Sequence, residues 1–575
     1  MTCNGVGLCA MVHLELVQGV YSVTKLKKGR QRQQKGKRMV MRKCIWASAG
    51  LIGVFVWGLS VIGLAQQPRG TGYNPIEAQS THESHAPHSN TVQESSLSSA
   101  NGGEDSTSPG RRETLVLGAS AQDRPWFLRR LLTAYQNEFN PPSQTGEAEP
   151  APARRALPAP WDSPPFPGSE YQGSPLIGVP VNSKEYPLMK AMSDTSLGDL
   201  MRANRIKAYG WINGSYNWST ATNSNMPSSY WIVPNSVILN QAVFRLEREA
   251  DTVQTDHVDV GFRLTGLYGS DYRYMTAGGI FSQQLLKRNQ LYGFDPTEMY
   301  MDTYIPGIAD GLIIRVGRWV ATPDIEVQFA PDNYLATHSL QFTFDTYTQT
   351  GTLLTLALNK QWTIQGAIHS GTDMAPWYKG AVPTGMVGVR WVSEDNNDSA
   401  YIVLNNINTA KFQHFEENGQ PAGHDNFNYV VGTWQHRFSQ TVHSKLAGIF
   451  MWQRDAVLGG TPSIGPLQSF GGGGGRGALL PGTSLTYGIL NYTMIQVAPR
   501  DFITVRNEWW RDERGMRSGF AGHYSSHTIG LAHQLNDVVM IRPEAGYYHN
   551  YTRPTFGLGT EKGMFMVGTD VTLRF

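Results

Sequence analysis

The sequence predicts an all-β fold, a transmembrane antiparallel β-barrel of about sixteen strands with a disordered N-terminal extension. The first observation is the segment from Phe565 to Phe575, which alternates strictly. Its apolar side carries Phe565, Val567, Val571, Leu573 and Phe575, and its other side carries Gly568, Asp570, Thr572 and Arg574. A period of two predicts a strand. An uncovered apolar face would be an aggregation-prone edge in a soluble protein, whereas a barrel turns it toward lipid.

The second observation is the succession of strand-like segments from Arg205 onward. They cover 206–218, 236–249, 256–269, 298–305, 312–319, 350–359, 362–371, 384–393, 398–408, 427–438, 443–453, 484–497, 502–512, 524–535, 538–549 and 564–575. Short links such as 306–311 alternate with long links such as 270–297 and 454–483, which is typical of outer-membrane barrels. A soluble sandwich or propeller would not explain this parity. An even number lets the first and last strands pair antiparallel, and fourteen or eighteen strands stay open.

The third observation is composition. The chain has 575 residues, of which 11% are aromatic and 16% charged, whereas soluble proteins carry about a quarter charged residues. A net charge of +2 gives no electrostatic case for nucleic acid as a partner. The cysteines are Cys3, Cys9 and Cys44, so a protein processed after Ala65 would have no disulfide framework.

The N-terminal part is predicted to contain no folded domain. Residues 39–65 have the charged start and apolar core (51–62) of a signal peptide, with an N-terminal membrane anchor as the alternative. Residues 1–38 are then an upstream extension, with translation starting at Met39 or Met41. A Pro-, Ser- and Gly-rich linker is expected over 66–195, and the barrel domain over 196–575. Within the linker, 125–139 could form an amphipathic helix.

Charged residues on the polar sides of the strands are candidates to line a water-filled pore. They are Arg245, Glu247, Asp259, Arg263, Arg315, Arg506, Glu508, Arg542, Glu544, Asp570 and Arg574. Charges facing lipid would cost roughly 2–4 kcal/mol each at mid-depth, so these side chains are expected to face the lumen. There they could select polar solutes or form structural ion pairs.

The link 320–349 is unusually apolar for an exposed loop. Its Phe329, Tyr334 and Leu335 would be buried if it folded into the lumen as a constriction. Asp324, Glu326 and Asp332 would then face the pore. The alternative is a loop packed over the barrel mouth.

Signatures of catalysis and of cofactor binding are missing, so no catalytic, cofactor-binding or metal-binding residue is predicted. The sequence lacks G-x-S-x-G, H-E-x-x-H and G-K-[ST]. The run Gly471–Gly475 has no phosphate-loop lysine, and a flexible loop is favoured there. His82, His85 and His88 are interpreted as part of a solvated polar run rather than as metal ligands.

Several runs along the chain resemble a known family. They are R-A-L-P-A-P-W-D-S-P-P-F-P from Arg155, K-A-Y-G-W-I-N-G from Lys207, D-V-G-F-R-L-T-G-L-Y-G-S-D from Asp259, L-I-I-R-V-G-R-W from Leu312, L-N-K-Q-W-T-I-Q from Leu358, N-E-W-W-R-D-E-R-G-M-R from Asn507 and I-R-P-E from Ile541. In order and spacing, from about Arg154 to Phe575, they resemble the OmpL-like β-barrel porins (porin-2 type) of bacterial outer membranes. The resemblance implies a porin-like protein that passes small hydrophilic solutes, and it implies no catalytic residues.

The expected function is therefore passive diffusion of small hydrophilic solutes through a barrel embedded in outer-membrane lipid. The alternative is surface binding or adhesion through the long loops 270–297 and 454–483. Phe575 is expected to be the C-terminal signal for the barrel-assembly machinery. The oligomeric state stays open, with a homotrimer as a candidate because sixteen-stranded porins are usually trimers.

Overall fold

The structure is a computed structural model that describes residues 126–140, 153–158 and 177–575, except 229, 322–324, 379–380, 408–426 and 460–477. Several predictions fall outside the described residues. These concern the extension 1–38, the signal peptide 39–65, the linker histidines, Asp324 and the glycine run 471–475.

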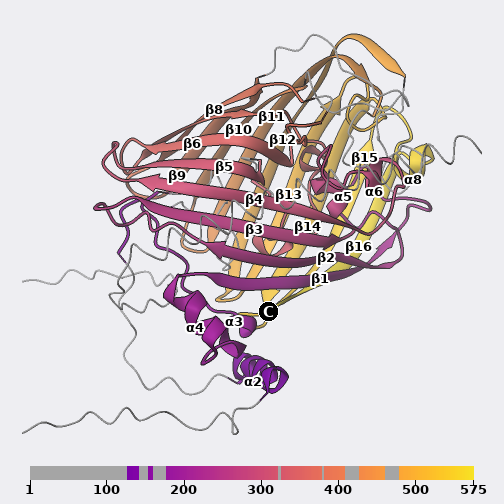
Figure 1. Cartoon of the computed structure of the whole chain (residues 1–575). Coiled ribbons are helices and arrows are strands. Elements are labelled where there is room, and N and C mark those ends of the chain that lie inside the picture. The colour runs from indigo at the N-terminus through magenta and orange to yellow at the C-terminus, as the bar shows by residue number, and fades with distance from the viewer. Residues whose placement is uncertain are drawn as a thin grey trace, which may run out of the picture. The chain divides into compact units, whose positions relative to one another are not determined.

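Sixteen antiparallel strands form one closed barrel, in which each strand pairs with its neighbours in sequence (Figure 1). Strand β1 closes the barrel against β16, with Gly214 opposite Val571. The strands are β1 Lys207–Ser219, β2 Val237–Arg248, β3 Asp259–Gly269, β4 Gly293–Ile305, β5 Leu312–Val320, β6 Thr348–Ala357, β7 Trp362–His369, β8 Thr384–Val392, β9 Asp398–Ile407, β10 Phe427–Arg437, β11 Val442–Val457, β12 Leu479–Ala498, β13 Asp501–Asp512, β14 Gly522–Gln534, β15 Val539–Asn550 and β16 Gly563–Arg574. The predicted fold class and strand count are confirmed.

Strand β16 shows how the wall is oriented. Phe565, Val567 and Val571 are each about two-fifths exposed, whereas Asp570 and Arg574 are buried. The apolar side therefore faces outward and the polar side faces the interior, as the alternation predicts.

Two bands of outward-facing aromatic rings lie at different heights on the wall. Toward the long-loop end, ring centroids are 6.4 Å apart for Trp218 and Phe565, 6.3 Å for Phe450 and Tyr487, and 5.9 Å for Tyr487 and Trp509. Toward the short-turn end, Trp362 and Trp391 lie 6.4 Å apart. Such bands are typical of the two membrane–water interfaces of a barrel.

Helices lie before the barrel and in its loops. They are α2 Phe127–Phe139, α3 Pro187–Ala191, α4 Ser196–Ala203, α5 Tyr272–Met275, α6 Gln283–Leu286, α7 Leu340–Thr343 and α8 Phe556–Gly559, with a 3₁₀ turn at Ala330–Asp332. Helix α2 matches the amphipathic helix expected at 125–139. None of the helices in the described part of the chain combines the length and apolarity needed to cross a bilayer.

Three strand boundaries differ from the prediction by four or five residues, namely the start of β4, the end of β11 and the start of β12. Strand β4 starts at Gly293 rather than at 298, because Pro296 lies where the register with β3 shifts between Thr265 and Leu267, and a bulge tolerates the missing N–H. Strands β11 and β12 extend into the predicted loop 454–483. There the Asp455 carboxylate accepts a hydrogen bond from the Gly482 N–H at 2.7 Å. This bond holds Gly482 within β12, although a glycine usually indicates the end of a strand.

Candidate functional site in the barrel interior

The segment between β5 and β6 contacts the inward-facing side chains of the barrel wall. We call its residues 325–347 the inner loop. Phe329, Tyr334 and Leu335 are buried, and the loop backbone contacts side chains of β2, β13 and β15. The inner loop therefore lies within the barrel.

Two carboxylates of the wall accept hydrogen bonds from the inner-loop backbone. Glu508 of β13 accepts the N–H groups of Leu340 and Gln341 at 2.9 and 2.7 Å. Glu544 of β15 accepts those of Ala336 and Thr337 at 2.7 and 3.1 Å. Among the described residues, neither carboxylate lies in an ion pair with an arginine; backbone N–H groups take that place.

Two arginines contact the backbone carbonyls of the same loop. Arg542 of β15 donates to the carbonyls of Ala330, Asn333 and Leu335 at 2.8, 2.8 and 2.9 Å, while its Nε donates to Asp570 at 3.0 Å. One buried guanidinium thus joins three points of the loop to β16.

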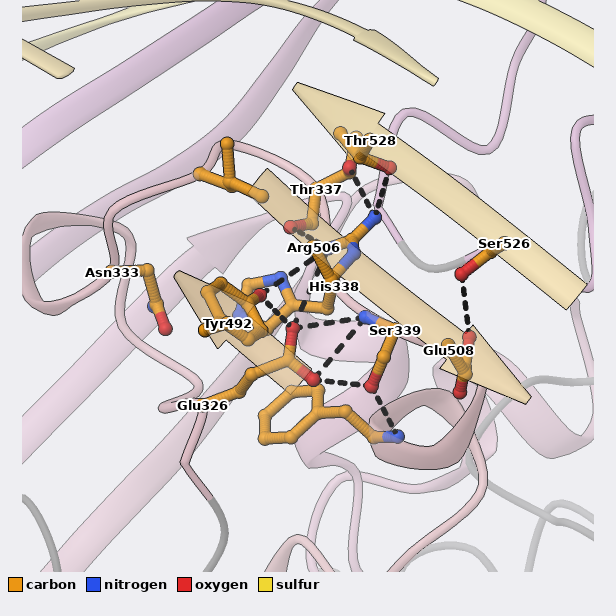
Figure 2. A network of polar contacts seen from close by, with 12 residues as sticks. Glu326, Asn333, Thr337, His338, Ser339, Tyr492, Arg506, Glu508, Ser526 and Thr528 are labelled. Carbon is orange, nitrogen blue, oxygen red and sulfur yellow. Dashed lines mark hydrogen bonds and ion pairs between the residues drawn. The ribbon is translucent and has the colours of Figure 1, made fainter. Parts of the chain in front are cut away.

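Arg506 of β13 makes the corresponding contact at the next turn of the loop. It donates to the Thr337 carbonyl at 2.6 Å and to the hydroxyls of Thr528 and Tyr548 at 3.0 and 2.9 Å. Figure 2 shows its guanidinium between Thr528, Thr337 and Tyr492. We call Arg506, Glu508, Arg542 and Glu544 the loop clamp.

Glu326 is enclosed by the loop and the wall rather than exposed to a passage. Its carboxylate accepts hydrogen bonds from the Ser339 N–H at 2.9 Å and the Tyr492 hydroxyl at 2.5 Å, and lies 3.5 Å from Arg506 (Figure 2). Burial raises the pKa of Glu326, while Arg506 opposes that rise. Asp332 is half-buried at the end of the 3₁₀ turn.

His338 is buried in an aromatic stack beside the clamp. Its ring lies 4.0 Å from that of Tyr230 and 4.5 Å from that of Phe342. Burial lowers the pKa of His338 well below its ordinary value. The ring is therefore neutral, and its Nε2 lies 2.8 Å from the Val327 carbonyl, which assigns the proton to Nε2.

Four other predicted charges of β2, β3 and β5 form ion pairs, most of them with carboxylates of β4. Arg263 contacts Glu247 at 2.8 Å and Glu298 at 3.3 Å, and Arg245 contacts Glu298 at 2.8 Å. We call this group, together with the pair Arg315–Asp302 at 2.8 Å, the ion-pair sector. The sequence interpretation missed Glu298 and Asp302, although their even spacing within 298–305 places both on the face opposite the outward-facing Met299 and Met301.

At the short-turn end of the barrel, the side chains of Asp259 and Arg574 form hydrogen bonds to neighbouring residues. Asp259 accepts from Arg205 at 2.5 Å, from Arg248 at 2.8 Å and from the Asp251 N–H at 2.8 Å, so it fastens the turn between β2 and β3. Arg574 donates to the Tyr186 hydroxyl at 2.6 Å.

Gln241 of β2 also contacts the inner loop, although the sequence did not single it out. Its side-chain oxygen accepts the Ala330 N–H at 3.0 Å, and its side-chain nitrogen donates to the Gln328 carbonyl at 2.9 Å. An uncharged amide carries no sequence signal for such a role. No group of three metal-ligating side chains occurs within the described residues.

A family model described as "Putative beta-barrel porin-2, OmpL-like" matches residues 205–575, which is more than half of the chain. The chain belongs to this family. The resemblance drawn from the sequence is thus confirmed for the barrel, and the match begins at β1 rather than near Arg154. A porin-like barrel of this family implies a location in the bacterial outer membrane, and membership of a porin family favours a channel over an enzyme.

Solved structures similar to this porin-family chain are outer-membrane proteins. The anion-selective porin from Comamonas acidovorans has a TM-score of 0.40 and 9% identity, with 64% of this chain and 99% of that chain covered. OprB of Pseudomonas putida has a TM-score of 0.42 and 12% identity, with coverage of 66% and 96%. The channel DcaP of Acinetobacter baumannii has a TM-score of 0.39 and 9% identity, with coverage of 64% and 97%. The curated proteins contain no match to the chain.

Proposed function

We propose that the protein is a diffusion channel of the outer membrane for small hydrophilic solutes, narrowed permanently by the inner loop. The observation that carries this proposal is the clamp of four charged wall side chains on the loop backbone. Sixteen-stranded barrels have interiors wide enough for an aqueous path, so a loop held inside must set the size of what passes.

The clamp favours a fixed restriction over a mobile gate. Four side chains of β13 and β15 hold the loop backbone at Ala330, Asn333 and the stretch 335–341. Opening would break several charge-assisted hydrogen bonds at once and leave buried charges without partners, which is costly.

The lumen charges are proposed to act on solutes through the field that they produce together. Wall and loop carry both signs, for example Arg506 beside Glu326 and Arg245 beside Glu298. Paired charges leave a modest net field, so weak ion preference is expected rather than strict selectivity.

Single-channel conductance in a planar bilayer tests the proposal. We expect stable steps with modest ion preference from the intact protein and larger steps from a variant in which 325–346 is replaced by a short glycine–serine link. Silence of both proteins, each folded and heat-modifiable on a gel, would contradict the channel and favour surface binding through the loops 270–297 and 454–483.

A further inference from the structure

Helices α2, α3 and α4 form a helical platform at the short-turn end of the barrel (Figure 1). Met189 of α3 and Met201 of α4 pack with Ala208 of β1, and Leu246 of β2 packs against the same cluster. Ala208 and Leu246 are paired in register, and both alternate with inward-facing neighbours such as Glu247. The platform therefore covers the outer, lipid-facing side of β1 and β2.

Contacts to α3 and to the end of β16 fix the rotation of α2. Arg130 donates to the Ser193 carbonyl at 2.7 Å, and the Tyr135 hydroxyl donates to the Arg574 carbonyl at 2.9 Å. This orientation leaves Leu128, Leu132 and Phe139 between 50% and 61% exposed. Their spacing of four and seven residues places them in one stripe along the helix.

Helix α4 presents a second apolar stripe. Leu197 and Leu200 are spaced by three residues and are 58% and 61% exposed, while Met201 is buried against the wall. Beside the platform, the outward-facing Ile212 of β1 and Phe244 of β2 are also about half exposed. The exposed apolar surface of the platform thus continues the lipid-facing surface of the barrel.

The outward tryptophans of the short-turn end do not extend to the strands β2 to β5 near this platform. Trp362, Trp391 and Trp434 lie on β7, β8 and β10. Outward side chains at that end of β2 to β5 include Leu246, Val260, Phe262, Ile305 and Leu312, and no tryptophan is among them. At the start of α2, Trp126 is 64% exposed and provides an indole that the wall lacks there.

Charge on α2 also suits a phospholipid surface. Arg129 is exposed, and within the described residues its side chain makes no ion pair. A long basic side chain beside an apolar stripe can extend to a phosphate while its methylenes cover apolar surface. Helices with this distribution lie in the plane of the membrane interface.

We propose that the helical platform is a membrane-surface anchor. The stripes of α2 and α4 enter the phospholipid leaflet on the short-turn side, and Trp126 and Arg129 lie among its headgroups. A second copy of the chain could cover the same stripes, but continuity with the lipid-facing wall favours phospholipid. This inference does not depend on conductance.

Site-specific fluorescence quenching in vesicles tests the anchor. In the full chain with Cys3, Cys9 and Cys44 replaced by serine, single cysteines are introduced by Leu132→Cys or Leu200→Cys and labelled with an environment-sensitive dye. The protein is reconstituted in phosphatidylglycerol–phosphatidylethanolamine vesicles. We expect blue-shifted emission and quenching by lipids with a nitroxide high on the acyl chain, several-fold stronger than for Thr133→Cys on the polar side of α2. Ile212→Cys on the barrel wall is the positive control.

Two outcomes would overturn the anchor. Quenching of the Leu132→Cys label by aqueous iodide to the same extent as the Thr133→Cys label would place α2 in water. Protection from both quenchers, together with cross-linking between copies at position 132, would assign the stripe to self-association. Heat-modifiable migration of every variant verifies that the barrel is folded, so neither outcome can arise from misfolding.

Discussion

The ion-pair sector and the loop clamp are both buried and charged, but they satisfy their carboxylates differently. In the ion-pair sector, Glu247 and Glu298 contact the guanidinium groups of neighbouring strands. In the clamp, Glu508 and Glu544 accept backbone N–H groups of a segment that lies about 165 to 210 positions earlier in the chain. The first arrangement joins side chains within the wall formed by β2, β3 and β4, whereas the second joins the wall to a loop.

The ion-pair sector and the loop clamp therefore stabilise different parts of the molecule. An ion pair between adjacent strands adds to a local ladder, and its loss leaves the topology unchanged. A side chain that holds backbone groups fixes the path of the loop whatever side chains the loop carries. Because a buried charge without a partner costs several kcal/mol, loss of one clamp residue should release the loop, whereas loss of an ion pair should only loosen the wall.

The largest effect is expected for Arg542→Met compared with Arg315→Met. Arg542 holds three loop carbonyls and Asp570, so its removal should cost about 3–5 kcal/mol by analogy with other broken buried pairs and should free the loop. Arg315 contacts Asp302 and the face of Tyr300, which both belong to the neighbouring strand β4. Unfolding free energy and single-channel conductance are the measurements.

Both arginine variants should be less stable, but only Arg542→Met should change the conductance step and expose the inner loop to protease. Equal conductance in the two variants would show that the clamp does not position the restriction.

A smaller effect is expected for Glu544→Gln compared with Glu247→Gln. The N–H groups of Ala336 and Thr337 both donate to one oxygen of Glu544. A glutamine amide can present its oxygen there, but a neutral acceptor binds N–H groups more weakly than a carboxylate, which should cost about 1–3 kcal/mol over the two bonds. Hydrogen exchange at those two amides should accelerate in Glu544→Gln and stay unchanged in Glu247→Gln. Acceleration in both variants would mean that the two sectors are coupled.

The sequence predicted the wall of this barrel well because the alternation of apolar and polar residues along each strand indicates which side chains face lipid. The alternation of Asp570 and Arg574 with Val571 and Leu573 identifies inward positions without any knowledge of neighbours. The same rule predicted that the clamp residues face the interior. It also offered Glu298, which was overlooked.

The contacts within the interior could not be predicted in this way. Whether Glu544 meets an arginine or a backbone N–H depends on the path of the inner loop, which has no period. Asp259 has the alternation expected of a pore-lining residue, yet its carboxylate accepts a hydrogen bond from the Asp251 N–H in the turn between β2 and β3. Helix α3 lies in the segment assigned to the linker, and α4, at the start of the predicted barrel domain, was not predicted, because short helices gain their stability from packing rather than from their own sequence.

A pH effect is expected at Asp373, which lies between β7 and β8. Asp373 accepts from the Thr348 N–H at 2.8 Å, and burial raises its pKa to about 7, against the opposing influence of Thr348, Arg318 and Arg517. Because the folded pKa exceeds the ordinary value of about 4, the folded carboxyl binds more protons than the unfolded one between these values. The contribution of Asp373 to the free energy of unfolding is therefore greatest below about pH 4. It declines as the pH rises toward 7 and is constant at higher pH.

The decline should appear in the exchange protection of Gly278 and Ala375, whose N–H groups bond to the carbonyls of Asp373 and Gly278. Protection corrected for intrinsic exchange should fall between about pH 4 and 7 and level off above. In Asp373→Asn it should be flat with pH. The same slope in that variant would assign the titration to another group, for which Asp271 is the candidate because burial raises its pKa to about 8.

The smallest effect is expected for Ser339→Ala, which tests the capping contact of the inner loop. The Ser339 hydroxyl accepts the Phe342 N–H at 3.1 Å as the cap of α7 and donates to Glu326. Thr195→Ala is the matched control, since Thr195 caps α4 through the Gly198 N–H at 3.0 Å and lies outside the lumen. Loss of a cap costs about 1 kcal/mol, and Ser339→Ala should cost more than the control because Glu326 also loses a donor. Equal destabilisation would mean that the Ser339 N–H and Tyr492 alone satisfy Glu326, so that the hydroxyl serves only the helix cap.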